Sequence, residues 1–120
     1  MNKKKILIID DETDLVEVLS VRLRANDFDV IVAFDGEEGL DKASRLKPDL
    51  IILDIGMPKV DGYTFVRGIK ADQSLSVIPI IVLTGRGDKM KDLFLQEGVK
   101  EYILKPFETK ELVDKIKRMM

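Results

Sequence analysis

Short apolar runs alternate with longer amphipathic segments along the whole chain. Aliphatic runs occupy residues 6–9, 30–32, 50–53 and 80–83, and a fifth run, Tyr-Ile-Leu, occupies 102–104. In the segments between the runs, and after the last one, apolar residues recur at helical spacing. The pattern therefore predicts five strands, each followed by a helix, with the helices centred on residues 15–23, 36–46, 62–71, 90–97 and 112–116.

Four of the five runs are apolar throughout and show no alternation with polar residues. Continuous apolar strands are typical of parallel sheets that are covered by helices on both faces. Right-handed crossovers then give an open, doubly wound α/β sheet, and we predict one (βα)5 domain with a five-stranded parallel sheet over residues 1–120. Ligands of such sheets bind at the carboxyl ends of the strands. Candidate functional residues should therefore follow directly after the apolar runs.

Composition excludes several kinds of chemistry. The chain of 120 residues has no cysteine and no histidine, so it can form no disulfide, no thiolate or histidine metal site and no histidine-based catalytic triad. Its net charge of −2 gives no general attraction for nucleic acid. The lysines at 3–5 precede only four apolar residues, too few for a signal peptide or a membrane span. We expect a cytoplasmic protein without direct membrane or nucleic-acid partners.

Acidic, hydroxyl and basic side chains follow four of the five runs. A parallel sheet would bring these side chains to one edge. Each also has a simpler structural explanation when taken alone. These explanations are a helix cap for Asp11, a turn residue for Asp54, a strand end or helix cap for Thr84, and an ordinary surface lysine for Lys105. The residues at these strand ends are Asp10, Asp11, Asp54, Thr84 and Lys105.

Electrostatics favours a cation at this edge. Two carboxylates about 4 Å apart repel by roughly 4 kcal/mol at an effective dielectric constant of 20, so three gathered carboxylates need protons or a cation. An all-oxygen ligand set suits a hard ion, and Mg2+ is the usual one where phosphate is handled. Carboxylates, a metal, a lysine and a hydroxyl together indicate phosphoryl transfer, with Asp54 as the nucleophile that forms an acyl phosphate.

Four segments resemble the signature segments of response-regulator receiver domains, the flavodoxin-like phosphoacceptor domains of two-component systems. The segments are 8–12 (IIDDE), 53–62 (LDIGMPKVDG), 82–84 (VLT) and 104–107 (LKPF). Each segment alone is a weak to moderate signal, but all four occur in order and with fitting spacing. The resemblance covers essentially the whole chain.

The resemblance implies a role for each matching residue. Asp54 would accept a phosphoryl group from the phosphohistidine of a histidine kinase or phosphotransfer protein. Mg2+ would bind the carboxylates of Asp11 and Asp54 and the carbonyl of Gly56, with Asp10 acting through metal-bound water. Thr84 and Lys105 would contact the phosphoryl oxygens, the Lys105–Pro106 peptide would be cis, and Tyr102 would be the aromatic switch that turns inward on activation. Such a protein is a signalling switch that catalyses its own phosphorylation and dephosphorylation, not an enzyme acting on other substrates.

Two departures from the family pattern concern the rim of the site. Gly85 stands where alanine is frequent, and both residues are small. Gly56 and Arg86 occupy positions that vary in the family and are thought to tune phosphate lifetime.

Three alternatives remain open at this point. A haloacid-dehalogenase-like phosphatase would need a second aspartate where Gly56 stands. A flavin- or dinucleotide-binding domain would need a third glycine where Met90 stands. A degenerate receiver that only binds partners would lack part of the acidic, hydroxyl and lysine set, which is complete in this chain.

Self-association is expected to be weak. The charged set Lys91, Glu101, Glu111 and Lys115 partly resembles the dimerisation face of receivers joined to winged-helix DNA-binding domains. Lysine replaces the usual arginine at 115, and Val99-Lys100 replaces Ala-Asp, which removes one acidic partner. We therefore expect a monomer that self-associates at most weakly when phosphorylated, with an output partner that the sequence does not name.

Overall fold

The computed structural model describes residues 3–56 and 61–120, and within them strands and helices alternate along the chain. The strands are β1 (Lys5–Ile9), β2 (Asp29–Ala33), β3 (Leu50–Leu53), β4 (Ile80–Thr84) and β5 (Glu101–Leu104). The helices are α1 (Thr13–Ala25), α2 (Gly36–Leu46), α3 (Gly62–Ala71), α4 (Lys91–Gln96) and α5 (Thr109–Met119). The predicted (βα)5 order is confirmed.

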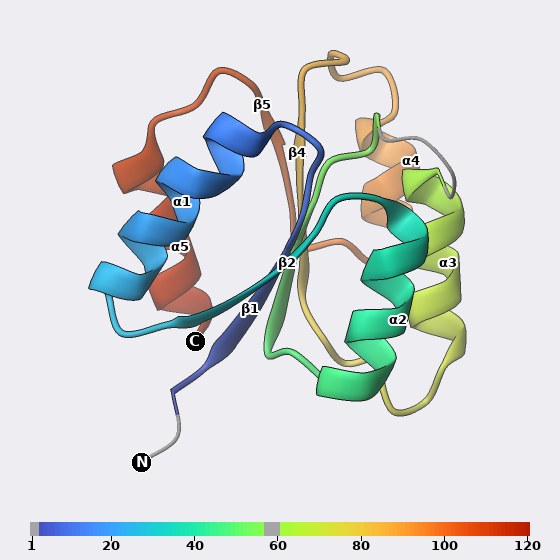
Figure 1. Cartoon of the computed structure of the whole chain (residues 1–120). Helices are drawn as coiled ribbons and strands as arrows, with labels where there is room; N and C mark the ends of the chain where they lie inside the picture. Colours follow the sequence, from blue (N-terminus) through green and yellow to red (C-terminus); the bar gives the residue numbers. More distant parts are fainter. Residues whose placement is uncertain (1–2, 57–60) are drawn as a thin grey trace.

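The strands form one parallel sheet in the order β2-β1-β3-β4-β5. Figure 1 shows α1 and α5 on one face of the sheet and α2, α3 and α4 on the other. This is the doubly wound arrangement that the continuous apolar runs predict.

Each central strand contributes to two hydrophobic cores. Leu7 and Ile9 of β1 pack with the α2–α4 layer, whereas Ile6 and Ile8 pack with α1 and α5. Successive side chains of a strand point to opposite faces, so covering both faces requires an apolar residue at every position. All four residues of β3 are accordingly buried.

Capping residues and left-handed residues set several helix ends. Asp35 accepts a hydrogen bond from the Glu38 amide at the start of α2, and Lys47 ends that helix in the left-handed conformation (φ 46°), directly before Pro48. Asp61 caps α3 through the Thr64 amide. Helix α4 is shorter than the predicted 90–97. The turn after it passes through Gly98 (φ 99°).

No helix in the described ranges is long and apolar enough to cross a membrane.

Candidate functional site

The site is built on the carboxyl ends of β1 and β3, which are neighbours in the sheet. The ladder between them pairs Ile9 with Leu53, and the Asp54 amide donates to the Ile9 carbonyl at 2.9 Å. The Asp10 amide donates to the Ala33 carbonyl at 3.1 Å. Sheet hydrogen bonding therefore fixes both aspartates at the same edge, and their side chains are only 3% (Asp10) and 10% (Asp54) exposed.

Three carboxylates gather at this edge. Asp10, Glu12 and Asp54 each offer an oxygen, and these oxygens lie within 4.8 Å of one another. Asp11, which the sequence suggested for this group, is exposed and outside this set. Glu12 was not predicted. Its amide donates to Asp10 Oδ1 at 2.9 Å, and this short turn after β1 brings the Glu12 side chain back toward the site.

Lys105 bridges the carboxylates from the end of β5. Its Nζ lies 2.9 Å from Asp10, 2.5 Å from Glu12 and 3.8 Å from Asp54. The Lys105–Pro106 peptide bond is cis. The three strand ends thus bring together a partly buried lysine and the acidic group, as the sequence predicts for Asp10, Asp54 and Lys105.

The charges perturb one another's ionisation. Burial raises the pKa of Asp10 above its usual range and outweighs the hydrogen bonds from the Glu12 amide and Lys105; the charge of Asp54 raises it further. Burial alone would lower the pKa of Lys105, but its hydrogen bonds to Glu12 and Asp10, together with the negative charges of Asp10 and Asp54, outweigh that effect and the pKa is raised. The lysine therefore stays charged beside the acids.

Backbone amides orient the other polar groups of the site. Gly56 donates its amide to Asp54 Oδ1 at 3.1 Å. Thr84 is fully buried, and its hydroxyl accepts the Arg86 amide at 3.0 Å while its carbonyl accepts the Lys105 amide at 2.8 Å. Arg86 also covers Gly56, because a Cβ at position 56 would lie 2.7 Å from Arg86 Nε.

Tyr102 lies in β5, beside the β4–α4 loop. The side chain is buried, and its hydroxyl donates to the Gly87 carbonyl at 2.8 Å. The residue that the resemblance identifies as the aromatic switch therefore lies in an inward position in this structure.

The donor chemistry fits a hard divalent cation. All acidic donors in the cluster are carboxylate oxygens, and they lie close enough together to need a positive charge beyond that of Lys105. The carbonyl of Gly56 is one of the predicted donors, whereas residues 57–60 of the same signature segment lie outside the described residues.

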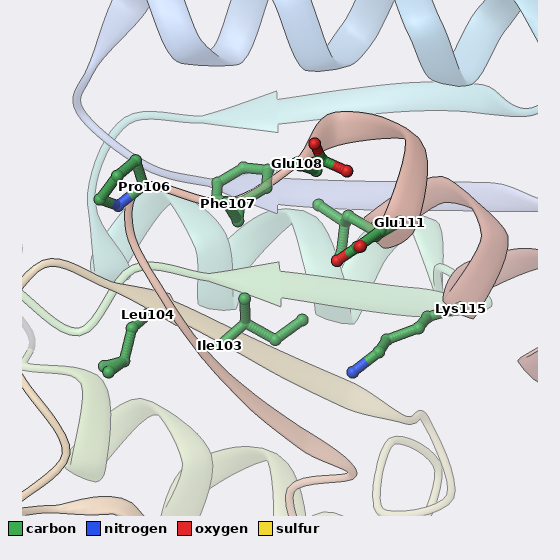
Figure 2. Close-up of a pocket in the computed structure, with 8 residues that line it drawn as sticks. Ile103, Leu104, Pro106, Phe107, Glu108, Glu111 and Lys115 are labelled. Carbon is green, nitrogen blue, oxygen red and sulfur yellow. The ribbon is translucent and has the colours of Figure 1, made fainter.

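Two hollows flank β5 and the segment that follows it. One, of about 440 Å³, borders the site itself and is lined by Glu12, Leu15, Lys105 and Phe107, among others. The other, of about 350 Å³, lies between the end of β5 and α5 (Figure 2), with Ile103 and Leu104 on one side and Glu111 and Lys115 on the other. The first hollow reaches Glu12 and Lys105 of the site, and the second belongs to the face formed by β5 and α5.

Comparisons of the sequence with family models and with known proteins agree on one family. Residues 6–117 match the model of the response regulator receiver domain. The chain is 40% identical to the alkaline phosphatase synthesis transcriptional regulatory protein PhoP of Bacillus subtilis (strain 168), over 98% of this chain and 48% of PhoP. The chain spans about half the length of the curated relatives it matches.

Solved structures share the fold at full length. The chemotaxis response regulator CheY4 of Vibrio cholerae superimposes with a TM-score of 0.91 at 28% identity, covering 99% of this chain and 100% of that one. The receiver domain of sensor histidine kinase PA1611 from Pseudomonas aeruginosa PAO1 has a TM-score of 0.87 at 30% identity, covering 98% and 97%. Its structure contains a magnesium ion coordinated in the active site cleft.

Proposed function

This chain belongs to the response regulator receiver family, and we propose that Asp54 is the residue that switches it, by accepting a phosphoryl group. The contacts of the Asp54 side chain within the site support this role most strongly. Its carboxylate accepts a hydrogen bond from the Gly56 amide and lies 3.8 Å from Lys105 Nζ. One of its oxygens lies within 4.8 Å of carboxylate oxygens of Asp10 and Glu12. Family membership makes the chain a two-component signalling switch.

The proposed reaction is a transfer from a phosphohistidine. An Asp54 carboxylate oxygen attacks the phosphorus, the phosphorus–nitrogen bond breaks, and the leaving histidine nitrogen takes up a proton. An acyl phosphate remains on Asp54. The donor is a cytoplasmic histidine kinase domain or a phosphotransfer protein. The 440 Å³ hollow is lined by Glu12 and Lys105 and so opens beside the acidic cluster.

Magnesium would be held by the acidic edge of the site. We propose as its ligands the carboxylates of Asp11 and Asp54 and the carbonyl of Gly56, with Asp10 acting through water. Asp11 lies outside the carboxylate cluster in this structure and would turn inward to bind the ion. The cation supplies positive charge to the oxygens of the transferred group and compensates the gathered carboxylates. Glu12 contributes to the same negative potential, because one of its oxygens lies in the cluster with Asp10 and Asp54.

Lys105 and Thr84 would bind the transferred group. The lysine Nζ already lies 3.8 Å from Asp54 and can exchange its bonds to Asp10 and Glu12 for bonds to phosphoryl oxygens. The Thr84 hydroxyl accepts a hydrogen bond from Arg86, which leaves its own proton free to be donated. A shift of Thr84 toward the phosphoryl group would favour the inward position of Tyr102, which lies on the adjacent strand.

The output of the switch would be read at the α4–β5–α5 face by a protein partner. Relatives of this chain include the DNA-binding response regulator MtrA of Mycolicibacterium paratuberculosis, of which the chain covers only 50%. With a net charge of −2, the receiver itself is not expected to contact nucleic acid directly.

The test is phosphorylation of the purified protein with acetyl phosphate, followed by intact-mass measurement. We expect one acid-labile phosphoryl adduct in the presence of Mg2+ and little after chelation. Calorimetry should show tighter Mg2+ binding with beryllofluoride, which mimics the phosphoryl group, because it adds a hard ligand and negative charge. No adduct with Mg2+, together with equal Mg2+ affinity with and without beryllofluoride, would refute the function.

A further inference from the structure

Helix α4 has little to hold it in place by itself. It spans only Lys91–Gln96, and Met90 at its start provides no side-chain cap. Phe94 is its one buried residue, whereas Leu93 and Leu95 are both more than a third exposed. So short a helix is marginal alone and depends on side-chain contacts with its neighbours.

Tyr63 in the first turn of α3 makes such contacts. Its hydroxyl donates to Glu97 Oε1, at the C-terminal end of α4, at 2.8 Å. Arg67 lies 3.6 Å from the same carboxylate, donates to the Tyr63 hydroxyl at 3.3 Å, and stands 5.8 Å from the centre of its ring. The Tyr63 ring meets Phe94 edge-on at 5.9 Å. One residue of α3 therefore contacts both the buried anchor and the end of α4.

The same aromatic contacts continue to the output face. The ring of Phe94 lies 6.1 Å from that of Tyr102, whose hydroxyl is bonded to the Gly87 carbonyl in the β4–α4 loop. The Tyr102 ring therefore packs against α4 through Phe94. A displacement of α4 would remove part of the packing that keeps Tyr102 inward.

The residue before Tyr63 packs against the backbone beside Asp54. Gly62 packs so closely on Ile55 that a Cβ at position 62 would lie 2.5 Å from the Ile55 side chain and 2.8 Å from its Cα. Ile55 is the residue directly after Asp54. The start of α3 thus rests on the backbone next to the phosphoacceptor.

We propose that Tyr63 and Glu97 form a latch that holds α4 against α3 and keeps Tyr102 inward. This Tyr63–Glu97 latch rests on the proposed function for its link to signalling. It connects Ile55, next to Asp54, with the output face by a route separate from the one through Thr84. Opening the latch frees α4 and lets Tyr102 turn outward.

The experiment uses Tyr63→Phe, which removes the hydroxyl and keeps the ring, and Glu97→Ala. Hydrogen exchange is measured on the amides of residues 91–99. We expect exchange to accelerate about tenfold in each variant, because a hydrogen bond to a charged group is lost. The double variant should show little beyond Glu97→Ala, because that substitution removes the Tyr63–Glu97 bond as well as the Arg67–Glu97 contact.

The tyrosines provide a second readout. The chain has two tyrosines and no tryptophan, so incorporated 3-fluorotyrosine gives two fluorine signals, and Tyr63→Phe leaves Tyr102 alone. In the variant we expect the Tyr102 signal to move toward that of a solvent-exposed tyrosine, and beryllofluoride to bring it back. Glu97→Gln, which can still accept the hydrogen bond, should retain most of the protection of α4.

Lys115→Ala serves as the matched control. It breaks a surface ion pair with Glu101 at 3.0 Å without touching α3 or α4, and should leave both readouts unchanged. Unchanged exchange and an unchanged Tyr102 signal in Tyr63→Phe would overturn the latch. Both readouts are taken before any phosphorylation, so they can fail while the acetyl phosphate adduct still forms, or succeed while it does not.

Discussion

Asp10 is the residue whose charge the fold accommodates least easily. Its side chain is 3% exposed, and its carboxylate shares a 4.8 Å cluster with Glu12 and Asp54. Lys105 compensates only part of this charge, and the pKa of Asp10 is raised by burial. A buried acid whose pKa is raised costs stability when it is charged, which makes Asp10 a candidate for a functional role.

We predict that Asp10→Asn stabilises the metal-free protein. The amide removes a buried negative charge yet can still accept the bonds from Lys105 and the Glu12 amide, so a gain of about 1 kcal/mol is expected, or roughly 4 °C in melting temperature. Thermal unfolding in a chelator should show it, and saturating Mg2+ should shrink the difference because it binds the wild type better. A variant that melts below the wild type without metal would contradict this account.

The same substitution has a defined pH dependence. The folded pKa of Asp10 lies above its unfolded value of 3.8, so the native state binds the proton more tightly. The stability that this proton provides is present below pH 3.8 and is lost as pH rises through the folded pKa. The stability gained by Asp10→Asn should therefore be small below pH 3.8, grow as pH rises to the folded pKa of Asp10, and stay constant at higher pH. An advantage that is largest in acid would point to another cause.

Helix α3 contains one glycine that close packing requires and one that it does not. Gly62 at its start packs on the Ile55 backbone, whereas a Cβ at Gly68 would meet only Leu40 at 3.5 Å, an ordinary contact. The first glycine fixes where α3 begins relative to the Asp54 loop. The second only adds flexibility within the helix.

We predict opposite effects of alanine at these two positions. Gly62→Ala should destabilise the protein by about 1–3 kcal/mol through overpacking against Ile55, whereas Gly68→Ala should stabilise it by roughly 0.5–1 kcal/mol through helix propensity. Urea unfolding measures both, and the pair controls for the chemistry of the substitution because both sites lie in α3. Equal shifts of the same sign would show that the contact with Ile55 is unimportant.

The bounds of strands and helices could be predicted from the sequence better than the contacts between them. Residues 50–53 and 36–46 were predicted with the observed bounds because apolar runs and helix-ending signals such as Pro48 are local. Glu12 was missed, since it enters the site through a turn that depends on the Asp10 side chain. The contact of Tyr63 with Glu97 joins two helices far apart in sequence, and no periodicity predicts it.

Across the whole molecule, most helices begin with acidic residues and end with basic ones. Acidic residues occur in the first turns of α1, α2, α4 and α5, and basic residues in the last turns of α1, α2, α3 and α5. The carboxyl edge of the sheet also carries the acidic cluster. This distribution complements the helix dipoles and gives the phosphoacceptor edge a negative potential that attracts a divalent cation.

We predict that the protein is a monomer and associates at most weakly when activated. Lys115 is already paired with Glu101 of the same chain at 3.0 Å, so this pair is not free to form the charged contacts of a dimer. Sedimentation with and without beryllofluoride tests the prediction, with Lys115→Ala as a variant that frees Glu101. The same tight dimer in both conditions would contradict it.

Locating the phosphoryl group in the phosphorylated protein shows whether Asp54 is the phosphoacceptor. The protein is treated with acetyl phosphate and Mg2+, the acyl phosphate is reduced with borohydride to a stable alcohol, and the peptides are sequenced by mass spectrometry. We predict the modification at Asp54 alone and its loss in Asp54→Asn. Modification of Asp10, Asp11 or Glu12 in the wild type, or an undiminished adduct in Asp54→Asn, would contradict the account.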